Sequence, residues 1–449
     1  MTPLPIRDAV TVLLCCAGDV LMVRRQPELP SFSGYWAFPG GKLEAADASG
    51  QTALVCAEAD PAVLVGLVRE VHEELGVDLN ALAAAGQVQA VHLLGEATTP
   101  PIAAARFRTR FLRIDLAQRP ALALDTREHS EATWATPADW LARYAKGRLL
   151  MAPPTLDAIT ALAAEPGCTR FTHFDEDGPS DECRIIEPLC GLRIIPVRSH
   201  TLPPATHTNA FLIGDSYKVL VDPSPADRTE LLRLMKLLDR VGVDEVLLTH
   251  HHPDHRQFAN EIAAHYDVPL ALSDTTRRFI KAEVPDYFGE LLLRTYEAGD
   301  TVTRWLGEPV RVIPVPGHDA GQIALMPDSK AWFIVGDLIQ GIGTVVIAKP
   351  EGHMGTYFET LQKVIDLDPA VIIPSHGMAM GTTYRLKETL KHRREREAAV
   401  LKLHREGKNA EEMLPLLYHG VDQRLWPLAR MNIEQHLDKL RDEGLITAS

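Results

Sequence analysis

The first part of the chain alternates short apolar runs with polar loops and contains one amphipathic helical stretch. The runs Val10–Cys15, Val20–Val23 and Phe107–Ile114 are short and aliphatic or β-branched, which predicts strands. Between them, Val63–Leu75 repeats apolar side chains at helical spacing. Strands and helices are therefore mixed, and we predict an α+β domain over residues 1–165.

A more regular rhythm begins near residue 191. Aliphatic runs there alternate with helical stretches such as Arg228–Val241 and Gln257–His265. The runs that predict strands are Leu192–Val197, Ala210–Ile213, Lys218–Val221, Glu245–Leu248, Val310–Val315, Ala331–Val335 and Ala370–Ile373. We therefore expect sheets covered by helices over residues 191–384.

Two further segments depart from these patterns. Residues 166–190 are rich in Pro, Gly and acidic side chains and have no period, so they form the predicted linker. Residues 385–449 contain a long charged helix at Arg385–Arg405, a helical stretch at Ala410–Tyr418 and a last helix at Leu425–Glu443. The expected fold class is α+β multidomain, with two larger domains, a linker and a small helical tail.

The composition predicts a soluble globular protein. Of 449 residues, 46% are hydrophobic and 24% are charged, and no stretch approaches the ~20 apolar residues of a membrane span. The net charge of −14 opposes unspecific binding to a phosphate backbone. The six cysteines form no C-x-x-C pair, which favours reduced thiols and a cytoplasmic location over a disulfide framework.

Metal-ligand side chains follow four apolar runs of the second pattern. Thr249-His-His-His-Pro-Asp-His255 follows Glu245–Leu248, and His318, Asp337 and His376 each close a later run. The ends of strands in one sheet lie near each other, so we expect these side chains to meet. Imidazole nitrogens and carboxylate oxygens suit zinc and similar divalent ions. The sequence therefore predicts a metal site in this domain.

The order HxHxDH, GH, GD and SHG resembles the metallo-β-lactamase superfamily from about Leu192 to Tyr384. The resemblance implies an αββα sandwich that binds two Zn²⁺ ions. The ligands it implies are His250, His252 and His318 for the first ion, Asp254, His255 and His376 for the second, and Asp337 as a bridge. Asp254 is also counted as catalytic, and His251, in the variable position of the motif, is given no ligand role. Asp222 resembles a buried aspartate that supports the ligand loop, with a simple turn-forming aspartate as the alternative.

A second constellation lies in the first domain, in the runs Trp36–Glu44 (WAFPGGKLE) and Arg69–Gly76 (REVHEELG). Glu70, Glu73 and Glu74 crowd one region of the predicted helix and repel one another. A bound Mg²⁺ would relieve this repulsion, because hard cations prefer carboxylate and diphosphate oxygens. We therefore predict a second metal site, of a different chemical kind from the first.

Together these runs resemble the Nudix box, and the resemblance spans about Arg7 to Leu162. It implies an α/β/α sandwich that uses Mg²⁺ or Mn²⁺. The roles it implies are metal ligands at Glu73 and Glu74, a ligand or general base at Glu70, and an orienting partner at Arg69. Two departures are Asp47, where the box has glutamate, and an insert at 48–68. A similar insert and the downstream pattern DTRE…EATW…PADW…MAPPTL resemble the subgroup that contains coenzyme A diphosphatases.

The tail ends in MNIEQHLDKLRDEGLI and resembles the small winged-helix appendage of some metallo-β-lactamase-fold hydrolases. A winged helix with basic residues favours a nucleic acid partner. The basic residues are Arg385, Lys387, Lys391, Arg393, Arg394 and Arg396. Glu388, Glu395 and Glu397 interleave with them, as in a solvated helix with ion pairs. We therefore favour a tail that covers the active-site mouth or an oligomer interface.

Three functions fit this sequence, and a bifunctional small-molecule hydrolase is favoured. Its lactamase half would cleave an ester or thioester, with acyl-coenzyme A as a candidate, and its Nudix half a diphosphate linkage, with coenzyme A as a candidate. The alternative is an endoribonuclease with the Nudix half as a binding module. In a third interpretation one half has kept its fold and lost its chemistry. The acidic chain, without an aromatic and basic groove, favours small-molecule substrates over nucleic acid, and no membrane partner is expected.

Overall fold

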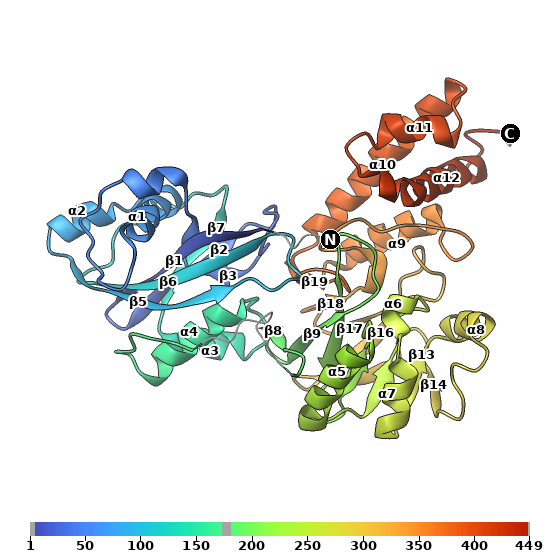
Figure 1. Cartoon of the computed structure of the whole chain (residues 1–449), viewed down its shortest axis with the longest axis horizontal. Coiled ribbons are helices and arrows are strands. Elements are labelled where there is room, and N and C mark those ends of the chain that lie inside the picture. The colour runs from blue at the N-terminus through green and yellow to red at the C-terminus, as the bar shows by residue number, and fades with distance from the viewer. Residues whose placement is uncertain (1–4, 173–180, 448–449) are drawn as a thin grey trace. The chain divides into compact units, whose positions relative to one another are not determined.

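The computed structural model describes residues 5–172 and 181–447 and divides into two compact units, Met1–Ile194 and Ile195–Ser449 (Figure 1). Separate clusters of buried apolar side chains form the cores of these units. Among the described residues, no helix combines the length and the apolar character needed to cross a bilayer. The multidomain α and β organisation expected from the sequence is confirmed.

The first unit is built on a mixed sheet with two long central strands. Strands β1 and β6 run parallel and pair along Ile6–Cys15 of β1, and the other strand pairs are antiparallel. The strand order is β3-β2-β1-β6-β5, with β4 also paired to β1 and β7 to β2. The strands are β1 (Ile6–Cys16), β2 (Asp19–Arg25), β3 (Trp36–Ala37), β4 (Gly40–Lys42), β5 (Val88–Thr98), β6 (Arg106–Leu116) and β7 (His129–Ala135).

Helices cover both faces of this sheet (Figure 1). The side chains of β1 explain why: Val12 and Leu14 belong to one core, and Leu13 and Cys15 belong to the other. Neighbouring strand residues point to opposite faces, so an apolar run such as this one needs cover on both. The helices are α1 (Pro61–Leu75) and α2 (Leu79–Ala84) on one face, and α3 (Pro137–Tyr144) and α4 (Pro153–Ala164) on the other. The predicted α/β/α sandwich is confirmed.

Helix α1 has sequence signals at both ends. Asp60 is its N-cap and accepts a hydrogen bond from the Ala62 backbone N–H at 2.8 Å, with Pro61 in the first turn. Gly76 ends the helix in the left-handed conformation, at φ 66°. The last two turns of α1 lie against strand β4, where a Cβ on Gly41 would be 2.5 Å from a carboxylate oxygen of α1. Glycine therefore lets β4 approach the acidic face of α1.

Part of the predicted linker, residues 166–190, packs on the first unit. Cys168 and Phe171 are buried in its core, and the Phe171 ring lies edge-on to Phe111 with centroids 5.3 Å apart. Residues 173–180 of the linker lie outside the described part of the chain. The linker was predicted from the Pro, Gly and acidic content of this segment. A single aromatic side chain, Phe171, nevertheless anchors part of it to the core. We therefore assign at least the Cys168 to Phe171 stretch to the first unit rather than to a linker.

The chain from β8 onward forms two further sheets, whose strands lie in the second unit except for β8 and the first residues of β9. The first has the order β14-β13-β12-β11-β10-β9-β8, and the second runs in chain order from β15 to β20. The strands of the first sheet are β8 (Ile186–Leu189), β9 (Leu192–Arg198), β10 (His207–Ile213), β11 (Val219–Val221), β12 (Glu245–Leu247), β13 (Leu270–Leu272) and β14 (Leu293–Thr295). Those of the second are β15 (Thr301–Trp305), β16 (Glu308–Pro314), β17 (Ile323–Pro327), β18 (Phe333–Ile334), β19 (Val371–Ile373) and β20 (Met380–Gly381).

Helices lie outside these two sheets and complete an αββα sandwich (Figure 1). Helix α7 contacts β12 and β13 of the first sheet, and α9 shares a core cluster with the second sheet. The helices are α5 (Arg228–Val241), α6 (Pro253–Arg256), α7 (Ala259–Tyr266), α8 (Asp274–Glu283) and α9 (Met354–Leu367). The architecture implied by the sequence resemblance is confirmed.

The tail is helical and has a small core of its own. Its helices are α10 (Tyr384–Arg405), α11 (Ala410–Leu417) and α12 (Trp426–Asp442). Val400 of α10, Met413 of α11 and Ile433 of α12 are buried together at the centre of this core. Helices α10 and α12 also contact α9, so the tail rests on the sandwich of the second unit.

Candidate metal centres

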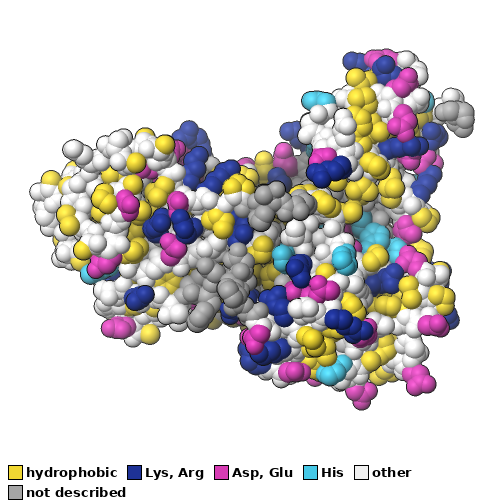
Figure 2. Space-filling view, in the orientation of Figure 1, with side chains coloured by type: hydrophobic (Ala, Val, Ile, Leu, Met, Phe, Trp, Pro, Cys, Tyr) yellow, Lys and Arg dark blue, Asp and Glu magenta, His cyan; other side chains and the backbone are white. Residues whose placement is uncertain are grey.

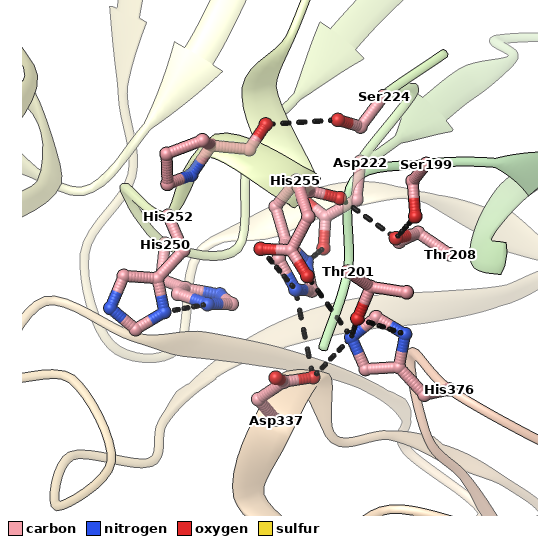
Figure 3. A network of polar contacts seen from close by, with 12 residues as sticks. Ser199, Thr201, Thr208, Asp222, Ser224, His250, His252, His255, Asp337 and His376 are labelled. Atoms are coloured by element: carbon pink, nitrogen blue, oxygen red, sulfur yellow. Dashed lines mark hydrogen bonds and ion pairs between the residues drawn. The ribbon is translucent and has the colours of Figure 1, made fainter. Parts of the chain in front are cut away.

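In the second unit, ligand-type side chains occupy four loops that each follow a strand. The loop after β12 carries His250 to His255 and includes the short helix α6. His318 follows β16, Asp337 follows β18 and His376 follows β19. Figure 3 shows three histidines of this loop turned toward Asp337 and His376, namely His250, His252 and His255. On the face shown in Figure 2, histidine side chains gather on this unit below the tail.

Three imidazoles form the first group. The Nδ1 of His252 lies 3.1 Å from the Nε2 of His250 and 3.1 Å from the Nε2 of His318. These ligand atoms all lie within 4.8 Å of one another. Nitrogen atoms bound to one zinc ion at ~2.0–2.1 Å have about this spacing. The group therefore has the donor atoms and the separation for one ion.

The second group contains two imidazoles and a carboxylate, next to the first. Asp254, His255 and His376 offer ligand atoms within 4.8 Å of one another. Asp337 Oδ1 lies 3.6 Å from His255 Nε2 and 3.4 Å from His376 Nε2. Its other oxygen, Oδ2, lies 3.8 Å from His318 Nε2 of the first group. Asp337 thus faces both groups, with one carboxylate oxygen toward each.

Four of these imidazoles are held from behind through their second nitrogen. The contacts are His250 Nδ1 to Thr249 Oγ1 at 3.0 Å, His255 Nδ1 to Asp222 Oδ2 at 2.9 Å, His318 Nδ1 to the Val346 carbonyl at 2.9 Å, and His376 Nδ1 to the His207 carbonyl at 3.0 Å. A carbonyl oxygen only accepts, so the neutral rings of His318 and His376 carry their proton on Nδ1. Their Nε2 lone pairs are then free to bind a cation.

Asp222 supports the loop after β12. It is buried, at a positive φ of 48°, and its Oδ1 accepts a hydrogen bond from the Thr249 backbone N–H at 2.7 Å. Its Oδ2 accepts from the Thr249 hydroxyl at 2.6 Å and faces His255 Nδ1. The carboxylate therefore fixes the loop and one ligand ring at once. Its contacts are those of the supporting aspartate and go beyond those of a simple turn former.

Two buried atoms of the centre fit a cation directly. Within the described residues, His255 Nε2 and Asp337 Oδ1 have no hydrogen-bond partner. A buried polar atom without a partner is costly, and a divalent ion between them would satisfy both. Burial opposes ionisation of Asp337, but His376 and His255 outweigh it and hold the pKa of its carboxyl well below the usual value. These two imidazoles therefore favour the ionised form of Asp337, which is the form that binds a cation.

In the first unit, the carboxylates of α1 meet the glycine turn of β4. Glu74 and Glu70 are buried, whereas the side chain of Glu73 is 57% exposed. Glu74 Oε2 accepts a hydrogen bond from the Gly40 backbone N–H at 2.9 Å and lies 3.3 Å from His129 Nε2. Three carboxylates at one end of one helix form a hard oxygen site of the kind that Mg²⁺ prefers.

Arg69 binds both the glutamates of α1 and Asp47, the residue that stands where the Nudix box has glutamate. Its NH1 donates to Glu70 at 2.8 Å and to Glu73 at 3.3 Å. Its Nε and NH2 donate to the two oxygens of Asp47, each at 3.1 Å. Although the insert at 48–68 separates Asp47 from Arg69 in sequence, the two side chains are in direct contact. Aspartate here makes the paired contact with arginine that two carboxylate oxygens allow.

Family models match three parts of the chain. "NUDIX domain" matches residues 5–153, "Metallo-beta-lactamase superfamily" matches residues 203–376 and "Beta-lactamase associated winged helix domain" matches residues 410–449. The chain joins a Nudix domain to a metallo-β-lactamase domain. Both belong to hydrolase families that depend on metals, and the protein is a metal-dependent hydrolase.

Curated proteins and solved structures resemble mainly the lactamase domain. "Beta-lactamase-like protein 2 homolog" of Drosophila melanogaster is 28% identical over 256 residues, which cover 54% of this chain and 85% of that protein. "Hydroxyacylglutathione hydrolase" of Bdellovibrio bacteriovorus is 32% identical over 164 residues, 36% of this chain and 59% of that protein. A β-lactamase domain protein from Burkholderia ambifaria has 22% identity and a TM-score of 0.50, over 60% of this chain and 91% of that one, which supports the fold.

The protonation states differ across the lactamase centre. Burial and the neighbouring imidazoles of His255 and His252 hold the pKa of His250 well below its ordinary value. Burial also opposes the charged form of His376, but Asp337 outweighs it and raises the pKa of that imidazole. In the Nudix domain, burial raises the pKa of Glu70 to about 7, against the opposing hydrogen bond from Arg69. Asp337 thus favours positive charge at His376, which a cation bound at Nε2 would supply in place of a proton. Burial favours the protonated form of Glu70 more than in an exposed glutamate.

Sequence reasoning gave no role to several residues that border the two sites. His251 is buried and contacts Asp319, which directly follows His318, and lies 3.2 Å from Glu283. Asp319 stands in the run GHDAG, so its place beside a ligand was a usable signal. His129 beside Glu74 had no such signal, because it lies on β7, far from the box in sequence.

Proposed function

We propose that the lactamase domain hydrolyses an ester or thioester with two zinc ions, and that the Nudix domain cleaves a diphosphate linkage with Mg²⁺ or Mn²⁺. The observation that carries the first part is the position of Asp337, whose two oxygens face two adjacent groups of ligand atoms. A carboxylate in that position can bridge two ions. Seven ligand-type side chains exceed what one tetrahedral zinc ion accepts.

The proposed ligand assignment follows the two groups. His250, His252 and His318 would hold one ion and Asp254, His255 and His376 the other, with Asp337 as the ligand that both would share. Two divalent cations held there would lower the pKa of water toward ~7 and polarise a carbonyl oxygen, which is the chemistry that ester or thioester hydrolysis needs.

The residues of the chain itself contribute orientation and charge. The Val346 and His207 carbonyls keep the protons of His318 and His376 on Nδ1, so that Nε2 faces the centre. Asp222 keeps His255 in the same state and ties its ring to the loop backbone. These side chains need little movement when substrate arrives, which keeps the reorganisation cost of the reaction low.

In the Nudix domain we propose Glu73 and Glu74 as metal ligands and Glu70 as a ligand or general base. The Gly40 N–H orients Glu74, and Arg69 orients Glu70 and Glu73. The raised pKa of Glu70, about 7, suits a base that must accept a proton near neutral pH. The insert and the downstream pattern of this domain resemble the coenzyme A diphosphatase subgroup, which makes a coenzyme A compound the first candidate substrate.

The substrate class of the lactamase domain is argued from chemistry and from relatives. A relative is named hydroxyacylglutathione hydrolase, and we carry over only its reaction class, hydrolysis of an acyl bond. An acyl-coenzyme A would offer a thioester to one domain and a diphosphate to the other. We therefore propose that the two domains act on related compounds built on coenzyme A. All six cysteines are free thiols, and we propose a cytoplasmic location.

The experiment follows both cleavages in one sample. The protein is incubated with acyl-coenzyme A thioesters, and free thiol and adenosine 3′,5′-bisphosphate are measured separately. Thiol release should be lost in Asp254→Ala and bisphosphate release in Glu74→Gln, each with the other product unchanged. Cleavage of single-stranded RNA with thioesters untouched would instead establish the endoribonuclease alternative.

The tail gives a specific reason to rank the nuclease second. Arg393 is buried and donates to the Val345 carbonyl, and Arg396 donates to the Leu417 carbonyl. Lys439 pairs with Glu397 at 2.7 Å. On the face shown in Figure 2, basic and acidic side chains of the tail are intermixed. A phosphate backbone needs a row of unpaired basic groups, and several of these bases already bind within the protein.

A further inference from the structure

The backbone at residues 345–347 links the winged-helix tail to one candidate ligand. The Val346 carbonyl accepts the hydrogen bond of His318 Nδ1 at 2.9 Å. The residues on either side of Val346 are bound by side chains of the tail. Building on the proposed function, we infer that the tail is a positioning element for the ion held by His250, His252 and His318.

Asn432 and Arg393 make the connection. Asn432, on α12, accepts from the Ile347 backbone N–H at 3.0 Å and from Arg393 NH1 at 3.1 Å. Arg393, on α10, donates through NH2 to the Val345 carbonyl. Asn432 is 5% exposed and Arg393 is 4% exposed, so water does not compete for these bonds. The two side chains therefore hold both neighbours of Val346 in place.

The tail also reaches the other side of the same ligand. Gly317, which precedes the ligand histidine, accepts through its carbonyl from the His353 backbone N–H at 2.8 Å. The next N–H, of Met354, donates to Gln435 on α12 at 3.3 Å. Gly317 has φ +130°, and a Cβ there would lie 2.4 Å from Tyr357 Cα. The backbone around the ligand is thus closely confined by α9, which the tail contacts.

Removing the Asn432 carboxamide would free the backbone at residues 345–347 from the tail. The Ile347 N–H and the Arg393 guanidinium would each lose a buried acceptor, and such groups move or admit water to find another. A shift at Val346 would loosen the bond that keeps the His318 proton on Nδ1. The ion bound through His318 Nε2 would weaken, whereas the ligands of the other ion keep their own partners, Asp222 and the His207 carbonyl. A tail that only adds general stability would not distinguish the two ions.

The test measures zinc affinity in the full-length protein. Wild type, Asn432→Ala, Asn432→Asp and Ile433→Val are loaded with Zn²⁺ and titrated with a chromogenic chelator. We expect Asn432→Ala to weaken one of two ions roughly tenfold or more, the one that His318→Ala removes. Asn432→Asp should restore most of the affinity, because its carboxylate still accepts from Ile347 and Arg393. Ile433→Val is the matched control, since Ile433 is buried in the tail core on the same helix.

Each outcome decides the inference. Unchanged affinity for both ions in Asn432→Ala, or equal weakening of both, overturns it. If Asn432→Ala does not fold, Arg393→Lys takes its place, because an ammonium group keeps the charge but cannot span both acceptors. Wild-type affinities in that variant also overturn the inference. A wild-type protein that binds fewer than two zinc ions would instead refute the binuclear function on which the inference rests, and the two failures are therefore distinguishable.

Discussion

The two metal sites of this protein differ in how the chain brings their ligands together. In the lactamase domain the side chains come from four loops between His250 and His376, and four imidazoles are each held through the nitrogen that faces away from the centre. In the Nudix domain the three carboxylates lie within the last two turns of α1, and the side chain of Glu73 is 57% exposed. Tertiary contacts set the first site, and helix geometry with one arginine sets the second.

This difference teaches how each site should respond to damage. A ligand in the lactamase domain is one member of a buried network, so its loss leaves other buried groups without partners. In the Nudix site the side chain of Glu73 is 57% exposed, so water can solvate the groups that its loss leaves behind. We therefore expect a substitution in the lactamase centre to reduce the activity of its domain more than an equivalent substitution in the Nudix site does.

Asp337→Asn should have the largest effect, because it removes the charge that both ion sites share. Wild type should contain two zinc ions per chain and the variant one or none, by elemental analysis. The kcat for ester or thioester hydrolysis should fall by on the order of 10³-fold, since several kcal/mol of transition-state stabilisation are lost.

Diphosphate cleavage by the Nudix domain is the internal control for Asp337→Asn and should be unchanged. A variant that keeps two ions and most of its activity would show that Asp337 is not the bridge. It would also remove the main contrast between the two sites.

Glu74→Gln should reduce diphosphate cleavage by roughly 10²-fold, a smaller loss than in the lactamase domain. The amide oxygen can still accept the Gly40 N–H, which lies 2.9 Å from Glu74 Oε2, so the fold should remain. One carboxylate charge is lost, and Mg²⁺ binds more weakly. Turnover of a diphosphate panel and of a thioester, measured in parallel, checks that only the Nudix reaction changes. Absence of diphosphate turnover in wild type would favour a binding role for this domain.

The fold could be predicted well from sequence because strong periodic patterns mark its elements. Val63–Leu75 was predicted as a helix and lies within α1 (Pro61–Leu75), and Arg385–Arg405 lies within α10 (Tyr384–Arg405). The segment at 166–190 shows what such patterns leave out. Its composition gave no sign that Phe171 packs against Phe111, because a single buried ring produces no period.

The site residues could be proposed from motifs because their side chains carry the chemistry and their order along the chain resembles a family. The contacts that hold these side chains in place could not be predicted from the sequence. The Val346 and His207 carbonyls belong to the backbone and have no residue signature, and Asn432 acts through the fold from a distant helix. Such contacts follow from tertiary packing alone.

Asp222→Asn should weaken zinc binding by roughly 10–100-fold, since it changes a supporting group and no ligand. Its Oδ1 can still accept from the Thr249 N–H. The new NH₂ group, however, would face the Thr249 hydroxyl and His255 Nδ1, which both donate to Asp222 Oδ2 in the wild type, so donor would meet donor. Ser224→Ala is the matched control, because the Ser224 hydroxyl donates to the Pro253 carbonyl of the same loop at 3.0 Å and accepts from the Gln257 backbone N–H at 3.2 Å. Equal chelator titrations for the two variants would mean that Asp222 merely shapes the loop.

The smallest effect concerns the proton on Glu70. Burial raises the pKa of this carboxyl to about 7, so below that pH the Nudix site carries one negative charge fewer before any cation binds. Mg²⁺ must displace the proton, and its affinity should therefore rise with pH and level off above about pH 7, with about a tenfold loss one pH unit below. Calorimetric titration of Mg²⁺ at several pH values tests this, and Glu70→Gln should flatten the profile. A wild-type affinity that stays constant between about pH 6 and 8 would show that Glu70 is already ionised. The Nudix carboxylates would then resemble Asp337, whose charge is held by its neighbours, and the contrast between the two sites would narrow.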